Sequence, residues 1–127
     1  MGRPIHFEIH AARPERAQAF YSGLFGWTFT KWGDQSYWLI KTGDGAPGID
    51  GGLVERRGAA PTAGQPVSSF VCTINVDDLE EAMKRGQSLG GAVALPRMAV
   101  PAVGWLGYLT DPEGNIFGLM QTDPQAR

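Results

Sequence analysis

Residues 5–11 alternate between apolar and polar side chains. Successive side chains of a β-strand point to opposite faces, so this alternation predicts a strand with two different faces. Phe7 and Ile9 lie on the apolar face, which we expect to pack against a helix. The polar face holds both histidines of the chain and one carboxylate: His6, Glu8 and His10. Inside a curved sheet, this polar face would form the floor of a site.

Two later segments have the apolar spacing of amphipathic helices. The first begins at Pro14, which suits the first helical position, and ends at Gly26. Its apolar stripe is Ala17, Phe20, Tyr21, Leu24 and Phe25. The second helix follows Asp78, and Glu81 stands three residues later, as in a capping box. A pair of glycines at residues 90–91 ends this second helix.

The remaining apolar segments predict strands. Their ranges are 27–32, 37–41, 49–55, 67–76, 92–98, 103–110 and 116–121. Residues 57–66 have no large apolar side chain and predict a linker. Residues 43–48 match G-x-G-x-x-G, but no helix is expected after them, so we interpret them as a hairpin loop rather than a dinucleotide site.

The predicted order of elements is strand, helix and three strands, and it occurs twice. Residues 65 positions apart match in the first strand of each half, where Ile9 corresponds to Ile74. Leu24 corresponds to Leu89 in the helices. These positions are the ones that packing would fix, so the sequence predicts an internal repeat.

Composition and charge exclude several classes of protein. The chain has 127 residues, 43% of them apolar and 19% charged, which is typical of one globular domain. The net charge is −2 and there is no block of Lys or Arg, so no nucleic-acid partner is expected. No apolar run approaches the roughly 20 residues of a membrane span, and no signal peptide is evident. We therefore expect a cytoplasmic protein without membrane contact. The lone Cys72 predicts no disulfide, and alternation places it on the helix-facing side as an inert core residue.

Residues 6–9, 19–21 and 24–27 read His-Phe-Glu-Ile, Ala-Phe-Tyr and Leu-Phe-Gly-Trp. Together with the Asp-Pro-Glu-Gly-Asn turn at 111–115, they resemble the vicinal oxygen chelate superfamily of glyoxalase I, bleomycin-resistance proteins and extradiol dioxygenases. The resemblance implies an α+β fold and a single domain over residues 1–127. Two tandem βαβββ modules, 4–56 and 67–121, would curl their mixed sheets around a shared cavity. It also implies a homodimer.

The resemblance further implies four positions for ligands of a divalent metal. His6 occupies the first, but the others fall on Val71, on Gly118 and near Gly51–Gly52, which offer no donor side chain. Such a site needs at least three donors. Neighbours on one strand face lie about 6.8 Å apart, so His6 with Glu8, or Glu8 with His10, would form only a weak two-donor site. No cofactor is therefore expected, and a divalent metal remains the alternative.

Other roles are open for these residues. His6, Glu8 and His10 are candidates for acid–base catalysis or for polar groups of a pocket. Alternatively, Glu8 only holds a histidine ring by a hydrogen bond. The candidate ligand-binding residues are the strand aromatics and two positions equivalent to metal ligands: Trp38, Tyr37, Trp105, Tyr108, Phe29, Val71 and Gly118. The aromatic residues also suit ordinary sheet packing.

Three functions follow as hypotheses. The first, which we favour, is a protein of the bleomycin-resistance type with a degenerate metal site, which binds a small planar or antibiotic-like molecule. The second is a divalent-metal-dependent lyase, isomerase or dioxygenase. This hypothesis rests on His6, which occupies the first metal-ligand position. The third is a non-catalytic partner module. The sequence names no substrate, because members of one superfamily share a scaffold and differ in their sites.

Overall fold

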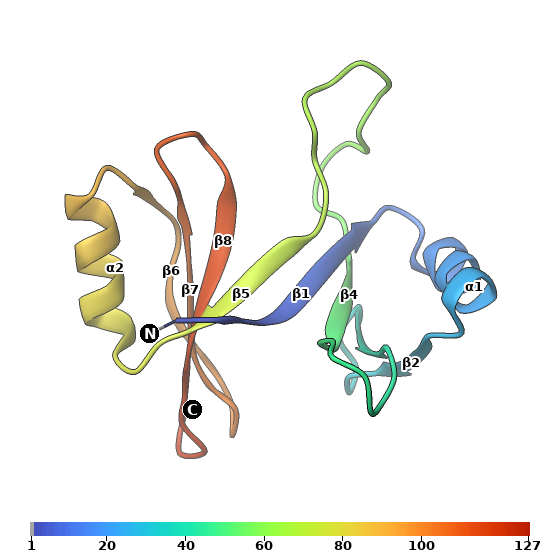
Figure 1. The fold of residues 1–127 in the computed structure, drawn as a ribbon, viewed down its shortest axis with the longest axis horizontal. Helices are drawn as coiled ribbons and strands as arrows, with labels where there is room; N and C mark the ends of the chain where they lie inside the picture. The colour runs from blue at the N-terminus through green and yellow to red at the C-terminus, as the bar shows by residue number, and fades with distance from the viewer. Residues whose placement is uncertain (1) are drawn as a thin grey trace. The chain divides into compact units, whose positions relative to one another are not determined.

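The computed structural model describes residues 2–127 (Figure 1). Its elements in chain order are β1 (Pro4–Ala11), α1 (Pro14–Phe25), β2 (Thr28–Lys31), β3 (Tyr37–Lys41), β4 (Gly51–Glu55), β5 (Val71–Asn75), α2 (Leu79–Ser88), β6 (Ala92–Val100), β7 (Gly104–Thr110) and β8 (Ile116–Thr122). The predicted α+β fold class is confirmed. The chain divides into two compact units. The first unit is His6–Phe70, and the second joins the residues before His6 to Val71–Arg127.

The first unit contains a four-stranded sheet in the order β2-β3-β4-β1. β1 and β4 run parallel, whereas β3 pairs antiparallel with both β2 and β4. The buried core of this unit is Phe7, Ile9, Ile40 and Leu53. Burial of Phe7 and Ile9 confirms the alternation predicted for β1, because the polar side chains between them stay partly exposed.

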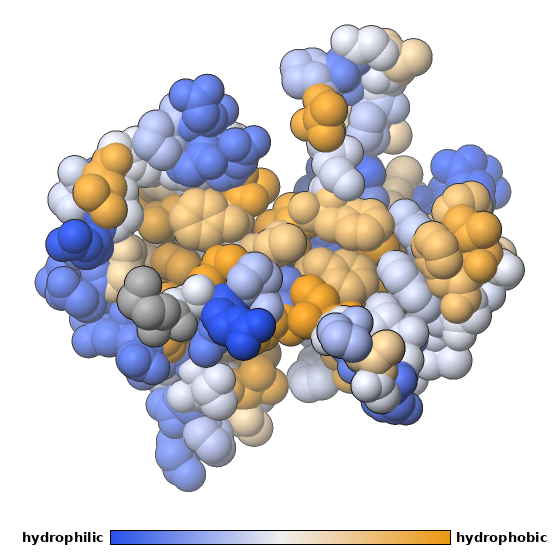
Figure 2. All heavy atoms as spheres, in the orientation of Figure 1, coloured by the Kyte–Doolittle hydropathy of each residue, from blue (hydrophilic) through white to orange (hydrophobic). Residues whose placement is uncertain are grey.

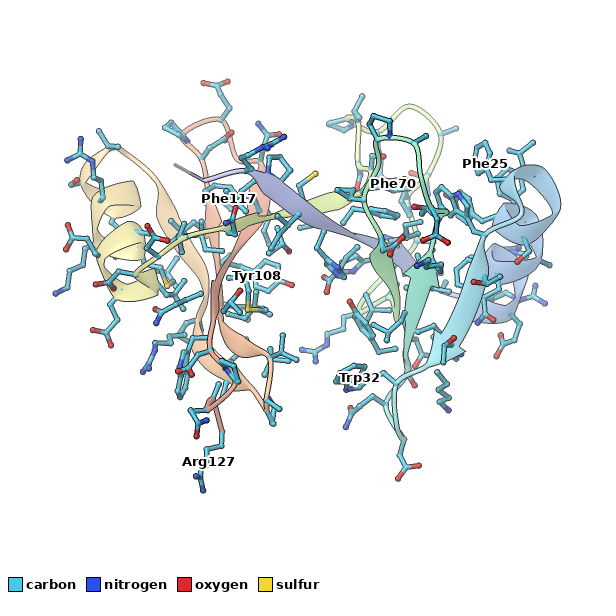
Figure 3. All side chains as sticks on the ribbon, turned by 60° about the horizontal axis from the view of Figure 1, so that its bottom comes forward. Phe25, Trp32, Phe70, Tyr108, Phe117 and Arg127 are labelled. Carbon is cyan, nitrogen blue, oxygen red and sulfur yellow. The ribbon has the colours of Figure 1, made fainter. Side chains whose placement is uncertain are left out.

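Local sequence fixes the ends of α1. Pro14 stands in its first turn, and Gly26 adopts the left-handed conformation that ends the helix, with φ of 75°. Ala17 and Tyr21 pack against the core of the sheet. The other members of the predicted stripe do not: Phe20, Leu24 and Phe25 are 58%, 60% and 56% exposed. Apolar side chains accordingly gather on the surface over α1 (Figure 2), with Phe25 near the end of the helix (Figure 3).

The second unit has the same order of elements and the same pairing. Its sheet runs β5-β8-β7-β6, with β5 and β8 parallel and β7 antiparallel to both of its neighbours. Its core is Leu79, Met83, Leu109 and Leu119. The predicted cap of α2 is confirmed, since the backbone N–H of Glu81 donates to the Asp78 carboxylate at 3.1 Å.

Some sequence-based expectations differ from the structure. β5 begins at Val71 rather than at Val67, which is 99% exposed, so the unpaired segment extends beyond the predicted linker. Cys72 is exposed rather than part of the core. Alternation assigns a side chain to a face, but α2 covers only part of that face, and Cys72 lies outside its contacts. Residues 43–48 form the loop of the β3–β4 hairpin, as predicted.

Neither α1 nor α2, the helices found within residues 2–127, has the length and apolar character needed to span a membrane.

Candidate functional site

The polar face of β1 lies opposite the core of the first unit. His6, Glu8 and His10 alternate with the buried Phe7 and Ile9, and so share that face. The Glu8 side chain is 14% exposed and that of His10 is 38% exposed. A carboxylate oxygen of Glu8 lies 3.9 Å from Nε2 of His10, which is ion-pair distance but too long for a hydrogen bond. The structure therefore brings the three predicted catalytic candidates to one side of the sheet.

Tyr37 of β3 completes this group. Its hydroxyl lies 3.0 Å from Nε2 of His6 and donates a hydrogen bond to Glu8 at 3.2 Å. A phenol has one proton to donate, so the Tyr37 oxygen accepts from Nε2–H of His6 when its proton goes to Glu8. His6, Tyr37 and Glu8 thus form a continuous chain of hydrogen bonds, which we call the polar triad.

Gly52 makes room for the Tyr37 ring. Residue 52 is the direct partner of Glu8 in the parallel β1–β4 pair and of Leu39 in the β3–β4 pair. A Cβ atom at this position would overlap the hydroxyl oxygen and Cζ of Tyr37. The polar triad therefore depends on glycine at residue 52, for steric reasons and not for backbone conformation.

Burial and charge oppose each other at His6. Burial lowers the pKa of His6, whereas the nearby negative charges of Glu8 and Asp50 act to raise it. Burial has the larger effect, so the ring is held neutral at neutral pH. Asp50 is itself fixed by Thr42, whose backbone N–H and hydroxyl both donate to the same carboxylate oxygen, at 2.9 and 3.1 Å. The backbone hydrogen bond from Thr42 is the main reason why the pKa of Asp50 lies below its usual range.

The donor side chains of this face fall short of a metal site. Within residues 2–127, no group of three or more His, Cys, Asp or Glu side chains is placed to hold a metal ion. A divalent site needs at least three protein ligands. Nε2 of His6 and a carboxylate oxygen of Glu8 are both hydrogen-bonded to Tyr37. The residues present do not fit the metal that the superfamily resemblance implies.

The structure separates the other aromatic candidates of the first unit from the polar triad. Trp38 and Phe29 pack against the core on the α1 side of the sheet. Trp38 follows Tyr37 in the same strand, so the two side chains must point to opposite faces. Leu39, two residues after Tyr37, shares the face of the triad and is 40% exposed.

In the second unit, too, the candidate ligand-binding residues lie on opposite faces of the sheet. Val71, Tyr108 and Gly118 share the face away from α2, around the buried Thr73. A Cβ atom at Gly118 would approach Thr73 Oγ1 to 2.9 Å and Tyr108 Cε2 to 3.1 Å. Trp105 packs on the α2 side.

Trp105 is held there by polar contacts. Its indole N–H donates to Asp123 at 3.0 Å, and the Arg97 guanidinium lies 3.9 Å from its ring centroid. These contacts give the ring a structural role in addition to its predicted role in ligand binding.

Two features of the site are absent from the candidates that the sequence suggested. Asp50 precedes β4 in a loop, and only the fold shows that it influences His6. The hollow of about 410 Å³ beside it is lined by the loop from Thr42 to Asp50. This hollow has no aromatic lining, so we do not assign a ligand to it.

Comparison with known proteins identifies the family. The chain is 30% identical to "Putative glyoxylase CFP32" of Mycobacterium tuberculosis over 127 residues, covering 98% of this chain and 46% of that protein. It is 27% identical to "Anthracycline biosynthesis protein DnrV" of Streptomyces peucetius, covering 93% of this chain and 46% of that protein. The chain thus spans less than half the length of these curated relatives.

A solved structure shares the fold. A glyoxalase/bleomycin resistance protein/dioxygenase superfamily member from Vibrio splendidus 12B01 matches with a TM-score of 0.65 and 17% identity, covering 95% of this chain and 99% of that chain. The model of the glyoxalase-like domain family matches residues 6–120. The chain therefore belongs to the glyoxalase-like domain family, within the vicinal oxygen chelate superfamily.

Proposed function

We propose that this chain binds a small planar molecule on the polar face of β1, without a resident divalent metal. The observation that carries the proposal is the polar triad. In it, the Tyr37 hydroxyl is hydrogen-bonded to both His6 and Glu8, and the Tyr37 ring lies against Gly52. Hydrogen-bonding groups that converge in this way fix the orientation of a ligand, and apolar surface beside them supplies affinity. Leu39 provides such surface on the same face.

The chemistry of the triad defines the ligand class. With Nε2–H of neutral His6 donated to Tyr37 and the Tyr37 proton donated to Glu8, the triad presents acceptor atoms, to which the hydroxyl groups of a ligand can donate hydrogen bonds. A fused aromatic ring with such substituents would satisfy these groups and cover Leu39. The name of the relative DnrV refers to anthracycline biosynthesis, which supports hydroxylated anthraquinones as first probes.

The test is ligand binding by calorimetry. A dihydroxyanthraquinone and bleomycin would be titrated into the wild-type protein, Tyr37→Phe and the control Tyr21→Phe, whose ring stacks on Trp27. We expect wild-type binding to weaken about fivefold in Tyr37→Phe, because one hydrogen bond is worth roughly 1 kcal/mol. The control should bind like the wild type. Absence of binding to both probes, or equal affinities in all three proteins, would contradict the proposal.

A divalent-metal enzyme is the second candidate, and one observation favours it. His6 and Glu8 are neighbouring donors on one strand face, and the name of the relative CFP32 refers to a glyoxylase. Elemental analysis would follow incubation of the protein with Ni, Zn, Mn and Fe(II) and exhaustive desalting. About one metal ion per chain, lost in His6→Ala, would favour this function over the first. A metal-free protein would leave ligand binding as the better proposal.

A further inference from the structure

The side chains at residues 37 and 52 compete for the same space. The ring of Tyr37 fills the space that a side chain at residue 52 would need, and its hydroxyl reaches across β4 to His6 and Glu8 of β1. We propose that Tyr37 and Gly52 are a coupled pair that closes the metal-ligand position of the first unit to divalent cations. The proposal concerns metal exclusion alone and stands whether or not the planar ligand of the proposed function binds.

Three contacts support this inference. Nε2 of His6, at 3.0 Å from the Tyr37 hydroxyl, would have to leave that hydrogen bond in order to bind a cation. The carboxylate of Glu8 would likewise lose its hydrogen bond from Tyr37. At residue 52, the position next to Glu8 in the β1–β4 pair, a side chain of any kind would collide with the Tyr37 ring. A cation would therefore lack a third ligand and compete with the tyrosine for the other two.

The second unit shows a related arrangement. Gly118 is the direct partner of Thr73 in the parallel β5–β8 pair, as Gly52 is of Glu8 in the β1–β4 pair. Tyr108 of β7 lies beside Gly118, where an added Cβ atom would meet its ring at 3.1 Å. The two glycines therefore correspond, but the tyrosines reach them from different places: Tyr108 is the direct partner of Gly118, whereas Tyr37 is the partner of Val54, two residues beyond Gly52.

The proposal predicts that two substitutions together would open the position. Tyr37→Ala removes the ring, and Gly52→Glu then adds a carboxylate on the strand next to Glu8. Neighbouring strands are about 4.8 Å apart, so the new carboxylate, Glu8 and His6 would converge on one ion. Three such donors with an open position are the ligand set of many zinc and nickel sites.

Metal retention and titration calorimetry with Zn²⁺ and Ni²⁺ test the inference. We expect the wild type to retain no stoichiometric metal after desalting. Tyr37→Ala/Gly52→Glu should retain about one ion per chain, and adding His6→Ala should abolish that retention. A wild type that retains one ion per chain through His6 would overturn the proposal. So would a folded double variant that binds no more metal than the wild type.

A single variant keeps the test decisive if the double variant fails to fold. Tyr37→Ala alone frees His6 and Glu8 from two hydrogen bonds that a cation would have to displace, so its Zn²⁺ affinity should exceed that of the wild type by about tenfold or more. His6→Ala in that background should remove the gain. Equal Zn²⁺ affinities of Tyr37→Ala and wild type would overturn the proposal. These assays contain no organic ligand, so their outcome is separate from that of the anthraquinone titrations.

Discussion

Replacing Gly52 with alanine tests whether the Tyr37 ring lies where the structure places it. The added methyl group would overlap the Tyr37 hydroxyl and ring, so the ring must leave its position. Backbone strain contributes nothing to this effect, because Gly52 is not among the glycines of positive φ. The entire destabilisation should therefore depend on the side chain at residue 37.

The expected magnitude follows from the contacts that are lost. The hydrogen bond between His6 and Tyr37 is worth about 1 kcal/mol, and the bond to the charged Glu8 about 1.5 kcal/mol. Overpacking of the sheet face adds about 1 kcal/mol if the ring moves only partly. Gly52→Ala should thus lower the free energy of unfolding by roughly 2–4 kcal/mol. In a Tyr37→Ala background the same change should be neutral or stabilising by up to about 1 kcal/mol, because alanine restricts the unfolded chain.

A double-mutant cycle measures this coupling. Urea denaturation, followed by circular dichroism, would give the free energy of unfolding of the wild type, both single variants and the double variant. The structure predicts a coupling energy of at least about 2 kcal/mol between residues 37 and 52. A destabilisation by Gly52→Ala that is below about 0.5 kcal/mol, or unchanged by Tyr37→Ala, would refute the placement of the ring.

Three further predictions concern the first unit. Leu53 is fully buried, so Leu53→Ala should lower the free energy of unfolding by about 2–5 kcal/mol, whereas Leu24→Ala, at an exposed site, should change it by less than about 0.5 kcal/mol. Gly23→Ala in α1 meets no atom within 4 Å and should raise the melting temperature through a gain of about 0.5–1 kcal/mol; a decrease would contradict the helical assignment. Because burial lowers the pKa of His6, the unfolded chain binds protons more readily below pH of about 6.5, and stability should fall as pH decreases from there. His6→Gln should flatten the profile between pH 7.5 and 5.5, above the range where Asp50 titrates, and a wild-type profile that is already flat would contradict the assignment.

Much of the fold could be predicted because local signals agree with it. Alternation in β1 specified its buried and polar faces, and Pro14 and Gly26 bounded α1. The Asp78 cap marked the start of α2. Exposure along α1 could not be predicted, because five apolar residues form the stripe but only part of it meets the sheet. Helical periodicity identifies the apolar side and does not measure how much partner surface is available.

The sequence could indicate which polar side chains share the face of β1, but not how they contact the rest of the sheet. Strand alternation is enough to separate Tyr37 from Trp38, once residues 37–41 are known to be a strand. The hydrogen bonds of Tyr37 to His6 and Glu8 depend on the order β3-β4-β1, which pairs strands distant in sequence. The importance of Gly52 likewise depends on cross-strand contact, since an isolated sequence shows only the absence of a side chain there.

The shared volume of Tyr37 and Gly52 has an evolutionary consequence. A mutation that supplies a carboxylate at residue 52 collides with the ring while Tyr37 is present, and loss of the ring alone breaks the polar triad. Each single step is therefore unfavourable, and the two positions can exchange roles only together. In an alignment of this family, a ligand-type side chain at the position of Gly52 should co-occur with a small residue at that of Tyr37, and glycine with a large one.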